Sequence, residues 1–145
     1  MLTVSRAIAP DEIARCLAIR RTVFIEEQGV DEALEVDGLD GDALHYLARL
    51  DEAAIATARV RLLDEAVGRV AKVQRVAVLR DVRGTGAGAA IMRHLMDDVA
   101  RAEGVSSFTL GSQESAVPFY QRLGYRIVGE RFMDAGIPHR TMVHP

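Results

Sequence analysis

The chain has 145 residues, a length that suits one domain with a single core, and we expect residues 1–145 to form one. With 49% hydrophobic and 27% charged residues it has an ordinary globular composition, and a net charge of −3 does not favour nucleic acid or an anionic membrane as the main partner. We find no basic-then-apolar leader and no apolar run long enough to span a bilayer, so we expect a cytoplasmic protein.

The N-terminal third predicts a strand, a helix and an acidic segment. Residues 2–4 favour a short strand, and apolar residues at helical spacing predict a helix over about 11–27. The single cysteine, Cys16, lies on the apolar face of that helix and is expected to be buried. Residues 30–43 carry six acids, too irregularly spaced for a calcium loop. They could form a solvated loop or a pocket wall that attracts a cationic substrate.

The rest of the chain predicts a mixed α/β layout. Alternating apolar residues over 43–50, 54–62 and 67–78 indicate three strands joined by short turns, which should be antiparallel. A helix over about 86–103 should bury Ile91, Met92, Leu95, Met96 and Val99. The strand after it, over 107–110, should run parallel to the strand before it, because a full helix separates the two. A short helix over 115–123 and a hairpin of strands 125–128 and 139–143 complete the chain.

The most distinctive stretch is the glycine-rich turn Arg83-Gly84-Thr85-Gly86-Ala87-Gly88, which lies between a strand and a helix. Such a turn presents backbone N–H groups to an anion at a helix N-terminus. It is not a Walker loop, because no Lys-Ser/Thr follows the last glycine. It fits a dinucleotide-binding turn only in part, because the one acid at the right distance, Glu103, precedes the next strand instead of following it. A turn that needs glycine only for packing is a third alternative.

The motifs around the turn resemble those of the GNAT superfamily of acetyl-coenzyme A dependent N-acetyltransferases. Arg83-x-x-Gly86-x-Gly88 follows Val76-Ala77-Val78 and precedes Phe119-Tyr120-x-x-Leu123-Gly124-Tyr125. The resemblance covers nearly the whole chain. It implies the GNAT fold, of the α/β (α+β) class, with a mixed, mostly antiparallel central sheet of six to seven strands flanked by about four helices.

Further motifs are similar to the ElaA-like branch of that superfamily. They are the segment from Arg21 to Gln28, the spaced acids of residues 35–40, His45, and Gly136-Ile137-Pro138-His139-x-x-Met142.

The resemblance implies acetyl-coenzyme A as the co-substrate. The backbone N–H groups of the turn would hold its pyrophosphate, with glycines leaving room for the approach; these residues are Arg83, Gly84, Thr85, Gly86, Ala87 and Gly88. Val76 and Val78 would pair with the pantetheine arm as if it were another strand, at a V-shaped gap in the sheet. The remaining residues implied for the cofactor are Gln113, Phe119, Tyr120 and Arg122.

Acetyl transfer to an amine needs a neutral amine, a stabilised oxyanion and a protonated leaving thiolate. A free alkyl amine has a pKa of roughly 10, so about one molecule in a thousand is neutral at pH 7, and a base is useful. The resemblance implies that the Val78 N–H stabilises the oxyanion and that Tyr120 protonates the thiolate. It implies no base on the strand before the turn, which carries Lys72, Gln74 and Arg75 where some members have Glu.

The base and the acceptor site must therefore lie elsewhere. Glu27 and His139 are our candidate catalytic residues. The candidates for the base are Glu27, Glu35, Asp37, His45, Glu130, Asp134 and His139. Residues expected to contact the acceptor are Glu27, Glu35, His45, Glu130 and His139. The acidic residues favour a cationic small-molecule amine, acetylated directly while both substrates are bound. No His/Cys cluster has metal-ligand spacing, so we expect no metal. Two alternative functions remain, a non-catalytic coenzyme A sensor and a dinucleotide-dependent oxidoreductase. The sequence is also compatible with a homodimer.

Overall fold

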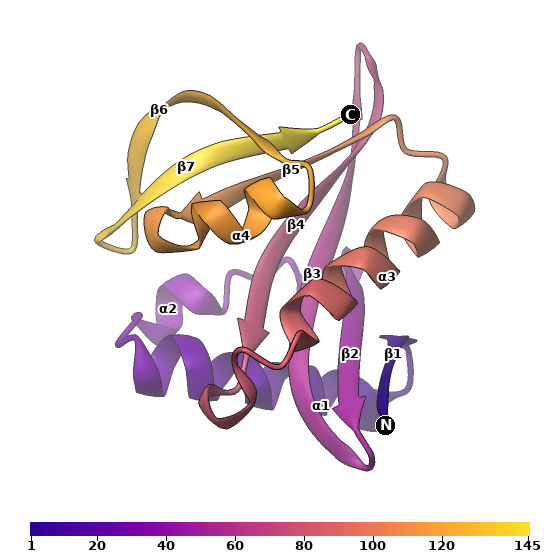
Figure 1. The fold of residues 1–145 in the computed structure, drawn as a ribbon, viewed down its shortest axis with the longest axis vertical. Coiled ribbons are helices and arrows are strands. Elements are labelled where there is room, and N and C mark those ends of the chain that lie inside the picture. Colours follow the sequence, from indigo (N-terminus) through magenta and orange to yellow (C-terminus); the bar gives the residue numbers. More distant parts are fainter.

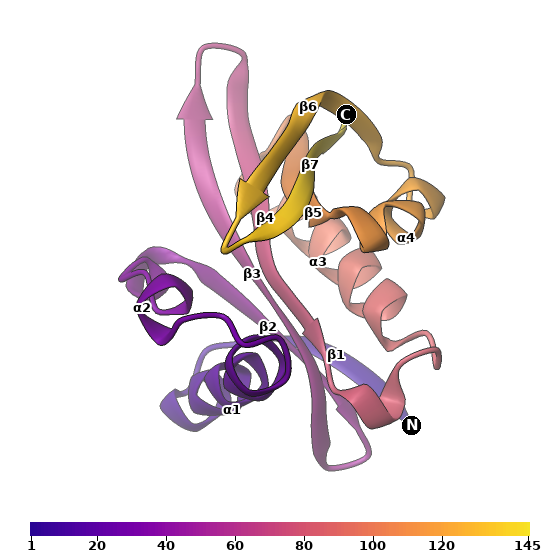
Figure 2. The same ribbon diagram turned by 90° about the vertical axis from the view of Figure 1, so that its left-hand side faces the viewer.

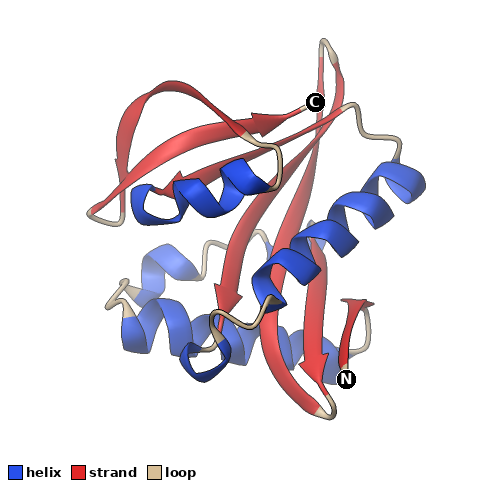
Figure 3. Cartoon of the chain, in the orientation of Figure 1, coloured by secondary structure: helices blue, strands red, loops and turns tan.

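The computed structural model describes residues 1–145 as one seven-stranded sheet in the order β1-β2-β3-β4-β5-β7-β6 (Figure 1). The strands are β1 (Leu2–Ala7), β2 (Leu44–Leu50), β3 (Ala53–Glu65), β4 (Gly68–Val78), β5 (Ser107–Gln113), β6 (Arg126–Asp134) and β7 (Ile137–His144). The α-helices are α1 (Pro10–Arg20), α2 (Glu32–Glu35), α3 (Ala87–Glu103) and α4 (Val117–Arg122). Shorter helical segments are the π-helix η1 (Arg21–Glu27) and the 3₁₀ turns η2 (Asp40–Asp42), η3 (Arg80–Val82) and η4 (Glu114–Ala116) (Figure 3).

The helices cover both faces of the sheet. Figure 2 shows α1 and α2 on one side of the sheet and α3 and α4 on the other. As expected, α3 buries Ile91, Met92, Leu95 and Val99 in the larger core cluster, where Met96 is partly buried. On the opposite face α1 buries Cys16 and Ile19 in a smaller cluster. Both faces of the central strands are therefore covered, and this fixes their register.

The predicted topology is confirmed. Strands β1 to β4 form an antiparallel meander, and α3 provides the crossover to β5, which is parallel to β4. The terminal hairpin of β6 and β7 adds to β5 through antiparallel pairing of β7. The fold is thus the mixed, mostly antiparallel sheet with flanking helices that the resemblance implies.

Two local features differ from the expectations. The predicted helix over 11–27 is α-helical only to Arg20; the next seven residues are a π-helix, and Gln28 N–H donates to Val23 O at 3.1 Å. The terminal strands are also longer than expected. They meet at a two-residue turn, Ala135-Gly136, in which both residues have positive φ angles of 50° and 75°. Apolar spacing could not show either feature, because it does not report hydrogen-bond register.

A bulge in β4 separates that strand from β5. Thr57 pairs with Ala77 and Arg59 pairs with Gln74, so one residue of β3 stands opposite both Arg75 and Val76. Arg75 has a φ of 56°, and such a bulge bends its strand. The parallel pairing of β4 with β5 ends at Val73, and the two strands diverge beyond it (Figure 1). This divergence produces the V-shaped gap.

Candidate active site

The gap between β4 and β5 contains a pocket of about 290 Å³. Apolar side chains of both strands, including Val73, Val76 and Leu110, line its interior. Phe24 of η1 and Leu34 of α2 form one side, and the β6–β7 hairpin forms another. The volume and the mixed apolar and polar lining suit a small organic molecule.

Tyr120 lines this pocket from α4 and is 8% exposed. Its ring packs edge-on against Phe119 and Tyr125, at centroid distances of 4.9 and 5.9 Å. Burial raises the pKa of the Tyr120 phenol well above its usual range, so the hydroxyl keeps its proton at neutral pH. Tyr120 is therefore a packed aromatic residue that lines the pocket and keeps its phenol protonated.

His139 lines the same pocket from β7. Its Nδ1 lies 2.7 Å from the Ile137 carbonyl, and its ring lies 5.6 Å from that of Phe132. A carbonyl can only accept, so Nδ1 donates and the neutral ring has its free lone pair on Nε2. The hydrogen bond thus orients an imidazole that can take up a proton.

The backbone around the glycine turn offers free donors. The first bond of α3 runs from Ala90 N–H to Gly86 O, and the amides of residues 84–89 donate to no acceptor of the chain. Leu79 N–H donates to Ile55 O, so the alternation of antiparallel pairs directs the Val78 amide away from β3 and toward the gap. These donors can hold an anionic group beside the pocket.

The glycines of the turn serve two different purposes. Gly86 has a φ of 89°, which favours glycine, and an added Cβ would meet nothing within 4 Å. At Gly88 an added Cβ would lie 3.3 Å from Phe119 and 3.5 Å from Val78. Gly88 therefore allows α3 to pack closely against α4 and β4, a reason the sequence alone did not reveal.

Glu27 is held by the turn and does not line the pocket. Arg83 binds both of its carboxylate oxygens at 2.6 Å and also donates to the Val78 carbonyl at 2.9 Å. The hydrogen bonds from Arg83 lower the pKa of Glu27. The Glu27 carboxylate thus connects η1 with the glycine turn through Arg83.

The other expected cofactor residues are dispersed around the gap. Gln113 lines the pocket at the end of β5 and donates to the Gln28 side chain at 2.9 Å. Phe119 packs against Gly88, and Arg122 is exposed on α4.

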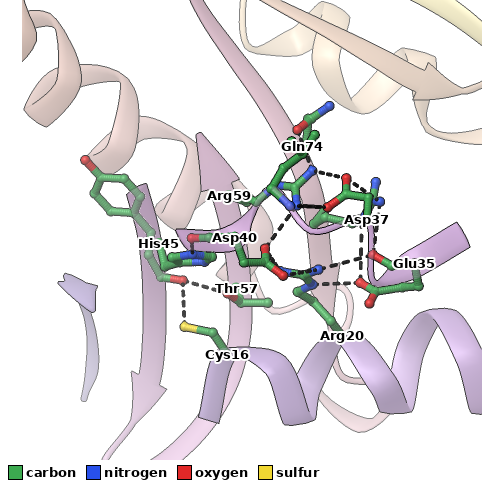
Figure 4. A network of polar contacts seen from close by, with 12 residues as sticks. Cys16, Arg20, Glu35, Asp37, Asp40, His45, Thr57, Arg59 and Gln74 are labelled. Carbon is green, nitrogen blue, oxygen red and sulfur yellow. Dashed lines mark hydrogen bonds and ion pairs between the residues drawn. The ribbon is translucent and has the colours of Figure 1, made fainter. Parts of the chain in front are cut away.

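Three carboxylates of the acidic segment are paired with arginines (Figure 4), while Asp31, Glu32 and Asp42 are exposed, as expected of a solvated loop. Glu35 and Asp40 each accept from Arg20 at 2.7 Å. Asp37 accepts two bonds from Arg59, at 2.8 and 2.9 Å, and these bonds hold the pKa of Asp37 far below its usual range. Three carboxylates are thus neutralised by arginines of the fold.

A third arginine, Arg75 of the β4 bulge, joins this network. It donates to the carbonyls of Leu34 and Glu35 at 3.2 and 3.1 Å and to the Asp37 carboxylate at 3.2 Å. The segment therefore gives little support to attraction of a cationic substrate, contrary to one of the two sequence-based interpretations. Glu35 still lines the pocket, with its charge compensated.

His45 and Glu130 are not among the pocket-lining residues. His45 is buried in β2, where its Nε2 contacts the Asp40 carbonyl at 3.0 Å. Glu130 is exposed on β6. Their assignment to the acceptor site gains no support from this placement.

Comparison with known proteins identifies the family. The model of the acetyltransferase (GNAT) domain matches residues 6–144. The chain belongs to the GNAT acetyltransferase family. A Bacillus subtilis (strain 168) chain named as an acetyltransferase, BSU40680, is 38% identical over 144 residues, 97% of this chain and 95% of its own length. ElaA of Escherichia coli (strain K12) is 28% identical over 136 residues, 93% of this chain and 88% of its own.

Solved GNAT structures agree with this assignment. The crystal structure of Escherichia coli ElaA has a TM-score of 0.85 at 25% identity and covers 100% of both chains. An acyl-CoA N-acyltransferase from Pseudomonas aeruginosa has a TM-score of 0.82 at 29% identity, over 100% of this chain and 99% of the other. The chain is thus an acetyl-coenzyme A dependent N-acetyltransferase of the GNAT family, similar to ElaA, and not a dinucleotide-dependent oxidoreductase.

Two pocket residues were missed or underrated by the sequence reasoning. Lys72 of β4 lines the GNAT pocket, although the sequence pointed only to the absence of Glu on that strand. Asp134 of β6 also lines it, next to the strained turn at Ala135. Two features of the sequence could have indicated these residues: a polar residue within a central strand, and an acid beside a tight turn. Among the helices of the chain, none has the length and apolar character needed to cross a membrane.

Proposed function

We propose that residues 1–145 act as one domain that transfers the acetyl group of acetyl-coenzyme A directly to a primary amine of a small molecule, in the cytoplasm. One observation carries this proposal: a protonated phenol on Tyr120 and an oriented imidazole on His139 line the same pocket, at the divergence of β4 and β5.

The backbone supplies the cofactor site. The free amides of residues 84–89 bind the pyrophosphate, and the edge of β4 at Val76 and Val78 pairs with the pantetheine arm. Gln113, Phe119 and Arg122 flank this path.

The chemistry follows from the orientation of these groups. His139 Nε2 accepts the proton of the acceptor ammonium, directly or through a water, so that a neutral amine attacks the acetyl carbonyl. The Val78 N–H donates to the resulting oxyanion. Tyr120 gives its proton to the thiolate as the carbon–sulfur bond breaks, and the second proton lost by the attacking nitrogen restores the phenol.

Direct transfer is favoured because the chain offers no suitable nucleophile for an acetyl-enzyme. Cys16 is 0% exposed in the core cluster between α1 and the sheet and does not line the pocket, and its Sγ donates to the Tyr46 carbonyl at 3.6 Å. Burial raises the pKa of the Cys16 thiol, which removes its thiolate character.

Calorimetry with acetyl-coenzyme A, followed by assays of free thiol release with a panel of amines, tests the proposal. Tyr120→Phe keeps the aromatic packing and removes only the acid. We expect about a 100-fold or greater fall in turnover with unchanged cofactor affinity. Absence of cofactor binding at millimolar concentration contradicts the proposal, and binding without amine-dependent thiol release would instead indicate a coenzyme A sensor.

A further inference from the structure

The charges that line the pocket fall into two groups. Glu35 and Arg75 are 3.4 Å apart and belong to the arginine network of the acidic segment. Lys72 and Asp134 also line the pocket, but neither forms a salt bridge with any residue of the chain. Because Glu35 and Arg75 are paired, the carboxylate and ammonium groups of the pocket lining that remain unpaired are those of Asp134 and Lys72.

These two residues lie on different walls. Lys72 is a half-buried residue of β4 and pairs with Thr109 of β5, in the region where the two strands are still hydrogen-bonded. Asp134 ends β6, in the hairpin that also carries His139. The pocket therefore has a cationic group on β4, where that strand still pairs with β5, and an exposed anionic group on the hairpin that also carries the imidazole.

An anionic ligand is the best match for the part of the pocket wall that Lys72 forms. Lys72 is half-buried and has no salt bridge or side-chain hydrogen bond within the chain, and apolar residues such as Val76 and Leu110 line the same pocket. A partly desolvated charge is stabilised when a ligand supplies an opposite charge that can accept hydrogen bonds. A carboxylate is the compact anion that occurs on the same small molecules as primary amines.

We propose that the acceptor is an amino acid or a related amino carboxylate, whose carboxylate binds Lys72 while its amine lies beside Asp134 and His139. This rests on the acetyl transfer proposed above and narrows the cationic small-molecule amine that the acidic residues favoured. Lys72 is then the residue that determines acceptor specificity.

Binding of matched acceptors tests the inference. Calorimetry in the presence of coenzyme A compares ω-amino acids of increasing length with the alkyl amines that lack only the carboxylate. We expect at least one amino acid to bind ten or more times more tightly than its matched amine, and Lys72→Met to abolish that preference. Arg61→Met is the control, because this substitution also removes one positive charge. Arg61 is the cross-strand partner of Lys72 on β3 and does not line the pocket.

Reversing the charge at Lys72 should produce a gain of binding, which a misfolded protein would not show. Lys72→Glu should bind diamines more tightly than the wild type does and should reject amino acids. Equal binding of amino acids and matched amines by the wild type, or a preference that survives Lys72→Met, overturns the inference. Thiol release from acetyl-coenzyme A is measured in parallel. If binding depends on the carboxylate but no thiol is released, only the proposed acetyl transfer is contradicted. If thiol is released and amines without a carboxylate are preferred, only the assignment of the acceptor is contradicted.

Discussion

Replacing Arg59 by Met tests whether the buried ion network stabilises the fold. Arg59 is 0% exposed and donates to Asp37 at 2.8 and 2.9 Å, to Asp40 at 3.0 Å and to Gln74 at 2.6 Å. Methionine has a similar length and no charge, so the substitution removes these bonds with little change in side-chain volume.

The expected loss in the free energy of unfolding depends on the arginine partners that Asp37 and Asp40 retain after the substitution. Breaking a buried ion pair costs about 3–5 kcal/mol when the partner charge is left uncompensated. Here Asp40 retains Arg20 at 2.7 Å and Asp37 retains Arg75 at 3.2 Å, while their side chains are 23% and 24% exposed. Since both can also gain water, we expect the low end, a loss of about 3 kcal/mol in the free energy of unfolding.

Urea-induced unfolding, followed by circular dichroism, measures this loss. Arg101→Met is the matched control, because it removes the same charge from an exposed pair with Asp97, and its effect should stay within about 0.5 kcal/mol. Asp37→Asn should cost much less in the Arg59→Met background than in the wild type, since the two side chains interact directly. An Arg59→Met protein as stable as the wild type would show that desolvation of the charges cancels their attraction, and the reasoning would be wrong.

Three further predictions concern the active site and acid stability. His139→Gln should lower kcat by about 100-fold or more with unchanged affinity for acetyl-coenzyme A, and an unchanged kcat would exclude His139 as the base. Gly86→Ala should destabilise the protein by about 1–2 kcal/mol in urea unfolding, because the φ of 89° is unfavourable for a residue with a Cβ, and no loss would contradict that strain. The lowered pKa of Asp37 contributes stability that is complete above the ordinary pKa of an aspartate, about 3.9, and is lost as the pH falls toward the pKa of the folded state. Unfolding measured at pH 2–5 should therefore show the difference in free energy of unfolding between the wild type and Arg59→Met decreasing below about pH 4.

Much of the fold could be predicted because its signals are local. The alternation in β2, β3 and β4 predicted the meander, and the length of α3 required a parallel β5. The glycine turn marked the junction of β4 and α3 because left-handed backbone at Gly86 needs glycine. Each of these inferences depends on residues within a single element or at its ends.

The site was less accessible because its decisive contacts join distant residues. Arg59 meets Asp37 across 22 positions, and Arg75 meets Leu34 across 41. A run of acids has the same composition whether it faces water, a substrate or buried arginines, so the sequence could not choose among these states. Likewise the sequence offered Glu27 as one of several candidates for the base, and only the structure shows that its carboxylate forms hydrogen bonds with Arg83.

The acidic segment and the β4 bulge act as one structural unit. Arg75 occupies a left-handed conformation, which costs a residue with a side chain about 1–2 kcal/mol. Its guanidinium makes three hydrogen bonds to the segment around α2, and together these offset that cost. Without them the strand could relax toward regular pairing, extend its parallel ladder with β5 and narrow the gap that contains the pocket. The acids thus act on the shape of the pocket, and selection among amines depends on the charges that the network leaves free, those of Lys72 and Asp134.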